Sequence, residues 1–192
     1  MGVSTKLTDL SLAEFCRRVA SRSPTPGSGS VAALVGALGT GLASMALRSA
    51  AGDTAAPCAE LERLRESLLE RVDQDAEAYE AFRAAPAASP VREQALQRSI
   101  AVPAEIAQLS LEALRALAEG ASGVRPALAS ECQMAAGALL AAVEGAAATA
   151  AANLPGLGDS AAAADHGFRL GAIRRRAREL SEGVRRRARS EA

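Results

Sequence analysis

Residues 24–51, PTPGSGSVAALVGALGTGLASMALRSAA, decide how the rest of this chain must fold. The first seven residues combine two prolines, two glycines and two serines, which is typical of a turn that leads into a helix start. The apolar run behind them carries small residues three or four positions apart, namely Ala32, Gly36, Gly39 and Ala43. Because small side chains let neighbouring helices approach closely, we expect a helix in the middle of a bundle. The amides at its start favour an anionic or electron-rich ligand.

The composition points to helices rather than sheets. The chain has 192 residues and a formal net charge of zero, so it is long enough for one domain and its bulk charge suggests no polyanionic partner. Aromatic residues make up only 2% of the sequence, so the core must consist mainly of alanine, leucine, valine and glycine. We predict an all-α fold, a single domain over residues 1–192.

The apolar spacing predicts about six helices joined by short turns, arranged as an antiparallel bundle. The first is short and begins after Ser11, which forms a capping box with Glu14. Pro103 lies inside the fourth helix, where we expect a kink or a restart. The expected ranges are residues 12–19, 31–51 (closed by Gly52 and Asp53), 58–85, 91–119, 127–153 and 160 to the arginine-rich end.

Three cysteines, Cys16, Cys58 and Cys132, are scattered without metal-ligand spacing, which indicates a reducing, cytoplasmic compartment. The first ten residues lack the apolar core of a signal sequence. The run over residues 31–47 is shorter than the roughly 20 residues that a membrane span needs and is diluted by polar and small residues. A buried helix of a protein without a membrane span explains it more simply.

Asp75 is the most informative polar residue outside the turn. On a helix it follows Val72 by three positions and precedes Tyr79 by four, which places it at the edge of the buried stripe. A carboxylate at such an edge loses hydration unless it is paired or used in function. The alternative is a slightly rotated helix that leaves Asp75 exposed beside Asp73 and Glu77.

The remaining polar candidates have simple structural explanations. Ser130 and Glu131 at a helix start suggest a cap and a dipole partner, and Asn153 suggests a helix end. Glu131 and Asn153 would stand ~33 Å apart on one helix, so they cannot both contact one small ligand within a single chain. The single histidine, His166, favours a surface or packing role, and the cluster needed for a metal site is missing from the sequence pattern.

The arginine-rich stretch over residues 173–189 has two interpretations, a solvated helix or a nucleic-acid-binding arm. Arginine and glutamate are spaced four apart in the pairs Arg175–Glu179, Arg178–Glu182 and Glu182–Arg186. This pattern is typical of ion pairs that support an exposed helix. Aromatic residues for stacking on bases are absent from the stretch, so we predict no nucleic-acid partner.

Taken together, several motifs resemble the cyclodeaminase/cyclohydrolase family, which comprises the cyclodeaminase domain of formiminotransferase-cyclodeaminase and the methenyltetrahydrofolate cyclohydrolases. The likeness covers nearly the whole chain, and its most specific part is the proline- and glycine-rich turn followed by Ser30-Val-Ala-Ala33. The other motifs are Leu12-x-x-Phe15, Asp73-x-Asp75-Ala-Glu-Ala-Tyr79, Val102-Pro103, Ser130-Glu131 and Asn153-Leu154 followed by Asp159.

The resemblance implies an all-helical homodimer that opens or closes the methenyl ring of a tetrahydrofolate derivative, with no metal and no permanently bound cofactor. By position it implies that Asp75 is catalytic, moving a proton or stabilising a cationic carbon. The substrate-binding residues that it implies are Pro26, Gly27, Ser28, Gly29, Ser30, Tyr79, Ser130, Glu131 and Asn153. The implied reaction is then either that of a cyclodeaminase or that of a cyclohydrolase.

Departures from the family pattern support two rival hypotheses. The usual triple glycine is Gly27-Ser28-Gly29 here, Thr149 or a neighbouring alanine replaces an asparagine, and the lysine-bearing stretch is missing from residues 51–60. These differences are compatible with a catalytically silent relative that binds a folate-like ligand or a partner protein. The alanine- and glycine-rich helix faces are equally compatible with a structural interaction module.

Overall fold

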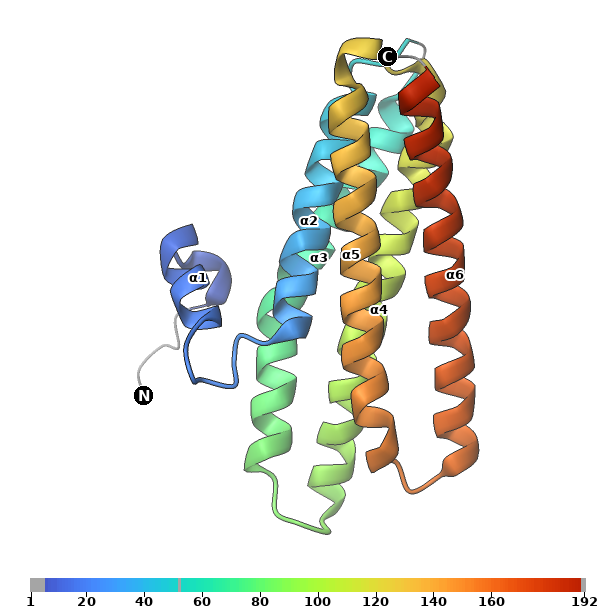
Figure 1. The fold of residues 1–192 in the computed structure, drawn as a ribbon. Helices are drawn as coiled ribbons and strands as arrows, with labels where there is room; N and C mark the ends of the chain where they lie inside the picture. Colours follow the sequence, from blue (N-terminus) through green and yellow to red (C-terminus); the bar gives the residue numbers. More distant parts are fainter. Residues whose placement is uncertain (1–5, 52, 191–192) are drawn as a thin grey trace.

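The computed structural model describes residues 6–51 and 53–190, and this part of the chain contains helices and no strand. Five long helices run side by side in alternating directions, and a short first helix lies beside them (Figure 1). The helices are α1 (Leu12–Val19), α2 (Ser28–Leu47), α3 (Ala55–Ala84), α4 (Pro90–Gly120), α5 (Ala129–Asn153) and α6 (Ser160–Ser190). The predicted all-α bundle of about six helices is therefore confirmed.

Helix α2 packs on α3, α4 and α5, whereas α4 packs on all four of the other long helices, so the predicted position of α2 in the middle of the bundle is wrong and α4 takes it. A Cβ atom added to Gly39 would lie 3.0 Å from Leu139 Cγ, and one added to Gly36 would lie 2.8 Å from Ser110 Oγ. Only glycine leaves room for neighbours this close. The small residues identified in the sequence therefore do bring α4 and α5 onto α2, as predicted.

Helix α2 ends earlier than predicted, at Leu47 instead of residue 51. The amides of Ser49 and Ala50 bond to carbonyls three residues back, and the Ala51 amide donates to Gly123 O. The hydrogen bond from Ala51 thus holds the chain against the loop after α4, and the chain leaves α2 before residue 51. Gly52, predicted to close the helix, lies outside the described residues.

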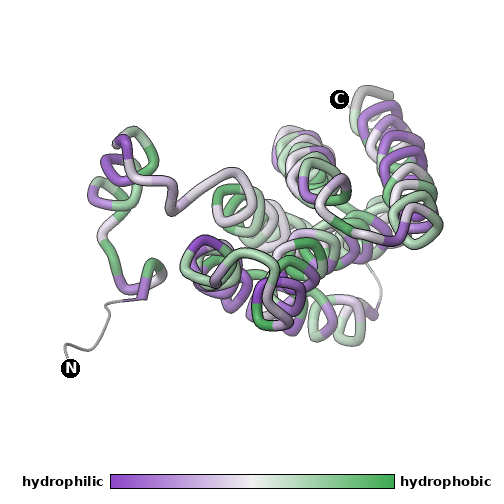
Figure 2. The backbone as a smooth tube through the Cα atoms, turned by 90° about the horizontal axis from the view of Figure 1, so that it is seen from below, coloured by the Kyte–Doolittle hydropathy of each residue, from purple (hydrophilic) through white to green (hydrophobic). Residues whose placement is uncertain are grey.

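The N-terminal part forms an arm beside the bundle, on the side away from α6 in the end-on view (Figure 2). Ser11 caps α1 as predicted by accepting a hydrogen bond from the Glu14 amide. The Glu14 side chain, however, pairs with Arg17 and Arg18 instead of completing a capping box. The short 3-10 helix η1 (Leu7–Asp9) is attached to α3, because the Leu7 amide and the Thr8 hydroxyl donate to Asp73.

Helix α4 is continuous through Pro103, so of the two predicted alternatives the restart is wrong and the kink stays a prediction. A proline lacks the amide proton that would bond to the carbonyl four residues earlier, which here is the carbonyl of Ser99. That carbonyl instead accepts a hydrogen bond of 2.9 Å from Asn153 Nδ2 at the end of α5. The helix continues because a neighbouring helix supplies the missing donor.

The arginines of α6 attach this helix to α5 as well as supporting it. Glu144 on α5 accepts from Arg174 Nε at 2.5 Å and from Arg178 Nε at 2.6 Å. Of the three predicted ion pairs, Glu182–Arg186 forms at 3.7 Å, whereas Glu179 pairs with Arg176 and Arg178 turns to Glu144. The spacing along α6 missed the partner of Arg178 because Glu144 lies on another helix, whereas Glu179 simply pairs three positions back instead of four.

Two stretches, Ser28–Leu47 and Pro126–Gly156, are long and apolar enough to cross a membrane. In the bundle, 61% and 50% of their most apolar windows are buried against other helices. Helices at the core of a bundle acquire this composition by packing alone. Their apolar character therefore carries only weak evidence for a membrane span.

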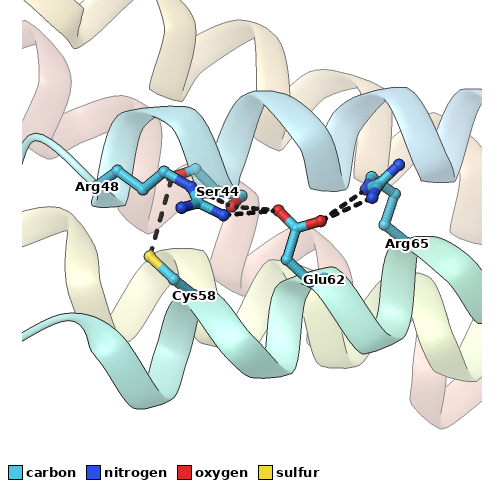
Figure 3. A network of polar contacts seen from close by, with 5 residues as sticks. All are labelled: Ser44, Arg48, Cys58, Glu62 and Arg65. Atoms are coloured by element: carbon cyan, nitrogen blue, oxygen red, sulfur yellow. Dashed lines mark hydrogen bonds and ion pairs between the residues drawn. The ribbon is translucent and has the colours of Figure 1, made fainter.

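A polar network joins α2 to α3 near the end of α2 (Figure 3). Glu62 on α3 accepts from Arg65 Nη2 at 2.7 Å, from Arg48 Nη2 at 3.0 Å and from the Ser44 hydroxyl at 3.0 Å. The hydrogen bonds from Arg65, then Arg48, then Ser44 lower the pKa of Glu62 from 4.5 to about 2. Beside them the buried Cys58 thiol lies 4.0 Å from Ser44 O.

This network makes part of the stability dependent on pH. A carboxylate whose pKa is lower in the folded state stabilises the fold above its unfolded value of 4.5, and this contribution is lost as the pH falls toward 2. Glu62→Gln is therefore expected to flatten the fall in the free energy of unfolding between pH 4.5 and 2, measured by urea denaturation. Glu66→Gln, on the exposed side of the same helix, is the matched control, and an unchanged slope in Glu62→Gln would contradict the assignment.

Candidate functional site

A cleft of about 340 Å³ opens beside the N-terminal end of α2. Four segments contribute to it: the turn before α2, the second half of α3, α4 near Ser99, and the last turns of α5. The lining residues are Pro24, Thr25, Gly27, Ser28, Gly29, Asp75, Tyr79, Ser99, Thr149, Ala152 and Asn153. The predicted glycine-rich turn and Asp75 thus face one cavity.

Gly29 makes the close contact between the turn and Asp75 possible. A Cβ atom added at Gly29 would lie 2.0 Å from Asp75 Oδ1, 2.4 Å from Cγ and 2.6 Å from Oδ2. All three distances are far below van der Waals contact, so any larger residue would displace the carboxylate. The glycine is therefore required by its neighbour on α3.

Asp75, which lies on α3, accepts hydrogen bonds from the first turn of α2. Gly27, the N-cap residue, has no side chain to bond the free amides. Asp75 Oδ2 instead accepts a hydrogen bond of 3.1 Å from the Ser30 hydroxyl, and the Ser30 amide also donates to this carboxylate. The hydrogen bonds hold the carboxylate at the floor of the cleft with a fixed orientation.

The electrostatic setting of Asp75 suits proton transfer. Burial raises the pKa of the carboxyl above its usual 3.8, and the two hydrogen bonds from Ser30 oppose this shift only in part. The residue is partly buried, so the exposed alternative considered from the sequence is wrong. Among the described residues that line the cleft, Asp75 is the only aspartate, glutamate, lysine, arginine or histidine.

Ser28 and Thr149 form a hydroxyl pair across the cleft wall. Their oxygens are 2.8 Å apart, and Thr149 Oγ1 also donates to Gly145 O at 2.9 Å on its own helix. Ser28 is the first residue of α2, which begins there instead of at the predicted residue 31, and Thr149 stands one turn before the end of α5. The pair links the start of α2 to α5.

Asn153 enters the cleft because of Pro103. The proline leaves the Ser99 carbonyl without an intrahelical donor, and Asn153 Nδ2 supplies one at 2.9 Å. This bond ties the end of α5 to the middle of α4 and fixes the orientation of the amide. Two residues that the sequence motifs listed separately, Pro103 and Asn153, thus form one structural unit.

Removing this donor is expected to cost stability in a way that depends on Pro103. Asn153→Ala leaves a polar carbonyl unpaired inside the bundle, a loss of about 1–3 kcal/mol. In a Pro103→Ala background the new alanine amide can serve the Ser99 carbonyl, so Asn153→Ala is expected to cost about 1 kcal/mol less. Urea denaturation of the four proteins measures the coupling, and strictly additive effects would contradict the link.

The other predicted positions lie at different distances from the cleft. Tyr79 lines it with 38% of its surface exposed, Ser30 bonds Asp75, and Pro26 is buried in the turn. Ser130 and Glu131 lie in the first turn of α5, at the opposite end from Asn153, and the cleft lining does not include them. Contact of Ser130 and Glu131 with a substrate stays a prediction, and the cleft within a single chain does not support it.

The predicted cap role of Ser130 is also wrong. The N-cap residue of α5 is Leu128, and the Ser130 hydroxyl donates to Glu131 Oε2 at 2.8 Å. A 3-10 turn, η3 (Pro126–Leu128), runs directly into α5, so Ser130 already lies inside the helix. Its hydroxyl therefore bonds a neighbouring side chain and no free amide.

The predicted site residues did not include Pro24, Thr25, Ser99 and Ala152, which line the cleft, and no contact was predicted for Thr149. Ser99 could have been identified from the sequence, because it lies four residues before Pro103. Its carbonyl therefore needs a hydrogen-bond donor from outside the helix. For a metal, no group of three histidine, cysteine, aspartate or glutamate side chains is suitably placed within the described ranges. The absence of a cofactor stays a prediction.

The chain is thus an all-helical protein in which the glycine-rich start of α2 meets an acidic residue of α3. Residues 11–169 match the family model described as formiminotransferase-cyclodeaminase, and the chain belongs to this family. The crystal structure of formiminotetrahydrofolate cyclodeaminase from Thermotoga maritima is similar, with a TM-score of 0.78, 26% sequence identity and 97% coverage of each chain. No curated protein matches the chain.

Proposed function

We propose that this protein is an enzyme of folate one-carbon metabolism, a 5-formiminotetrahydrofolate cyclodeaminase. Membership of the formiminotransferase-cyclodeaminase family and the similarity to the Thermotoga maritima cyclodeaminase over 97% of both chains support the reaction class. The observation that carries the proposal is Asp75, a partly buried carboxylate at the floor of the cleft. The turn over residues 26–30, Tyr79 and Asn153 are proposed to surround the folate.

The reaction needs a group that moves one proton. The folate nitrogen N10 attacks the cationic formimino carbon and closes a five-membered ring. In this ring the former formimino carbon is bonded to two folate nitrogens and to the amine that will depart. The proton on N10 must leave while the amine gains one, after which the bond to the amine breaks. Ammonia departs, and the methenyl ring keeps the positive charge of the substrate.

Asp75 is suited to both parts of this transfer. As a carboxylate it takes the proton from N10, and as an acid it gives the same proton to the departing amine. Its raised pKa makes the protonated form easier to reach near neutral pH than it is for an ordinary aspartate. Once it has given up the proton it is a carboxylate again, and its negative charge stabilises the methenyl cation that forms as the amine departs.

The cleft is equally compatible with water addition to the methenyl ring, the cyclohydrolase reaction. There Asp75 would accept a proton from the attacking water. A third possibility, binding without turnover, is favoured by the serine at position 28 in place of the family's central glycine. The three possibilities differ in what happens to the methenyl chromophore.

Ultraviolet absorbance separates these possibilities. With 5-formiminotetrahydrofolate, a cyclodeaminase produces the methenyl chromophore and ammonia faster than buffer alone. With 5,10-methenyltetrahydrofolate, a cyclohydrolase removes the chromophore faster than buffer alone. Calorimetry on the same protein then identifies a silent binder by heat without turnover, and neither turnover nor heat would overturn the proposal.

We also propose a cytoplasmic homodimer. Leu38 and Met45 on α2 and Met134 on α5 are exposed apolar side chains, and these two helices pack against each other. Such side chains are commonly covered in an assembly. Light scattering at micromolar concentration is expected to give twice the chain mass of 19.5 kDa, and a monomer would contradict the dimer.

A further inference from the structure

Three of the hydroxyl groups that line the cleft donate their protons to fixed acceptors in the protein. Thr25 donates to Glu80 Oε1 at 2.8 Å, and Ser99 donates to Leu96 O at 2.8 Å. Thr149 donates to Gly145 O at 2.9 Å. A hydroxyl has one proton, so these three oxygens can only accept further hydrogen bonds.

This constraint determines the direction of the bond between Ser28 and Thr149. The two oxygens are 2.8 Å apart, and by distance alone either one can be the donor. Because the Thr149 proton already goes to Gly145 O, Ser28 must donate to Thr149. Ser28 is exposed to the cleft, so its oxygen presents lone pairs and no proton to a ligand.

We propose that Thr149 is a positioning residue that makes Ser28 an acceptor and thereby selects a formimino group over a formyl group. This inference rests on the proposed function. The two groups have nearly the same shape on the folate nitrogen, but the formimino nitrogen carries N–H donors where the formyl group carries an acceptor oxygen. A lone pair of Ser28 attracts the first and repels the second.

Charge favours the same choice. The formimino group is cationic, and Asp75 lines the same cavity while accepting from Ser30. A formyl oxygen would face the lone pairs of Ser28 and a nearby carboxylate. The two acceptors, Ser28 and Asp75, reject a group that lacks the matching donor because these polar atoms would lose their partners.

The test compares two ligands on four proteins. The KM for 5-formiminotetrahydrofolate and the inhibition constant of 5-formyltetrahydrofolate are measured for wild type, Thr149→Val, Thr149→Ser and Ser28→Ala. In Thr149→Val the acceptor is gone and the Ser28 proton is free to face the cleft. We expect the formyl inhibitor to bind about ten-fold more tightly and KM for the formimino substrate to rise about ten-fold.

The control variants separate this effect from a structural one. Thr149→Ser keeps the hydroxyl and is expected to retain the wild-type preference, whereas Ser28→Ala is expected to weaken the preference without tightening formyl binding. The backbone amides of the turn are the same in all four proteins, so the ratio of the two constants measures the hydroxyl. Binding of both ligands with a ratio unchanged in Thr149→Val would overturn this inference and leave the proposed function intact. Failure of the wild-type protein to bind either ligand would instead overturn the proposed function.

Discussion

Asp75→Asn is expected to reduce turnover of 5-formiminotetrahydrofolate by about 10²–10⁴-fold, the usual contribution of a positioned acid or base. The asparagine oxygen can still accept from Ser30, so the cleft keeps its shape while losing the proton carrier. The measurement is the rate of methenyl absorbance increase at saturating substrate. Glu77→Gln removes an equal charge from an exposed position on the same helix and is expected to leave the rate unchanged.

The same variant is expected to be more stable than the wild type at neutral pH. Burial raises the pKa of Asp75, so the folded state binds its proton more tightly than the unfolded chain does. The stability that this protonation contributes is complete below pH 3.8, the ordinary pKa of an aspartate. It is lost as the pH rises through the raised pKa of the folded state. Asp75→Asn avoids that loss, so its unfolding free energy should exceed that of the wild type above pH 3.8 and equal it below that pH. An advantage that is independent of pH would contradict this account.

Gly29→Ala is expected to have the second-largest effect, because a Cβ atom there overlaps the whole Asp75 carboxylate. Forcing the carboxylate aside costs about 1–3 kcal/mol of folding free energy, as for other overpacked sites. It also moves the proton carrier away from the reacting atoms, and a displacement of about 1 Å can lower a rate by 10²-fold. Urea denaturation and the absorbance assay measure the two losses.

Two further variants identify the cause of these losses. Gly41→Ala, in the same helix, places its Cβ no closer than 3.8 Å to a neighbouring atom, so it should gain up to about 1 kcal/mol from helix propensity. Gly29→Ala combined with Asp75→Ala removes the overlapping carboxylate and is expected to recover stability without recovering turnover. If the double variant remained as unstable as Gly29→Ala, the overlap would not be the cause.

Much of the fold follows from periodic patterns within single helices. The spacing of small residues in α2 predicts its close packing on α4 and α5, and the stripe from Leu61 to Val72 predicts the buried face of α3. The edge position of Asp75 was also accessible, because it depends only on the phase of that stripe. These features require no knowledge of which helices are neighbours.

Several of the missed features depend on contacts between helices. The partner of Arg178 is Glu144 on α5, not Glu182 on its own helix. The continuity of α4 depends on Asn153, which is 54 positions from the carbonyl that it serves. Likewise Thr149 acquires its place in the cleft only when α5 packs on the start of α2. No periodicity within one helix reports such pairings.

The attachment of the N-terminal arm has a practical consequence for protein engineering. Asp73, which holds η1, lies two positions before Asp75 on the same helix. A bulky tag or reporter fused ahead of η1 would therefore pull on the backbone that carries the acid. Labels for imaging or immobilisation belong instead after α6, which ends at the top of the bundle in Figure 1, away from the start of α2.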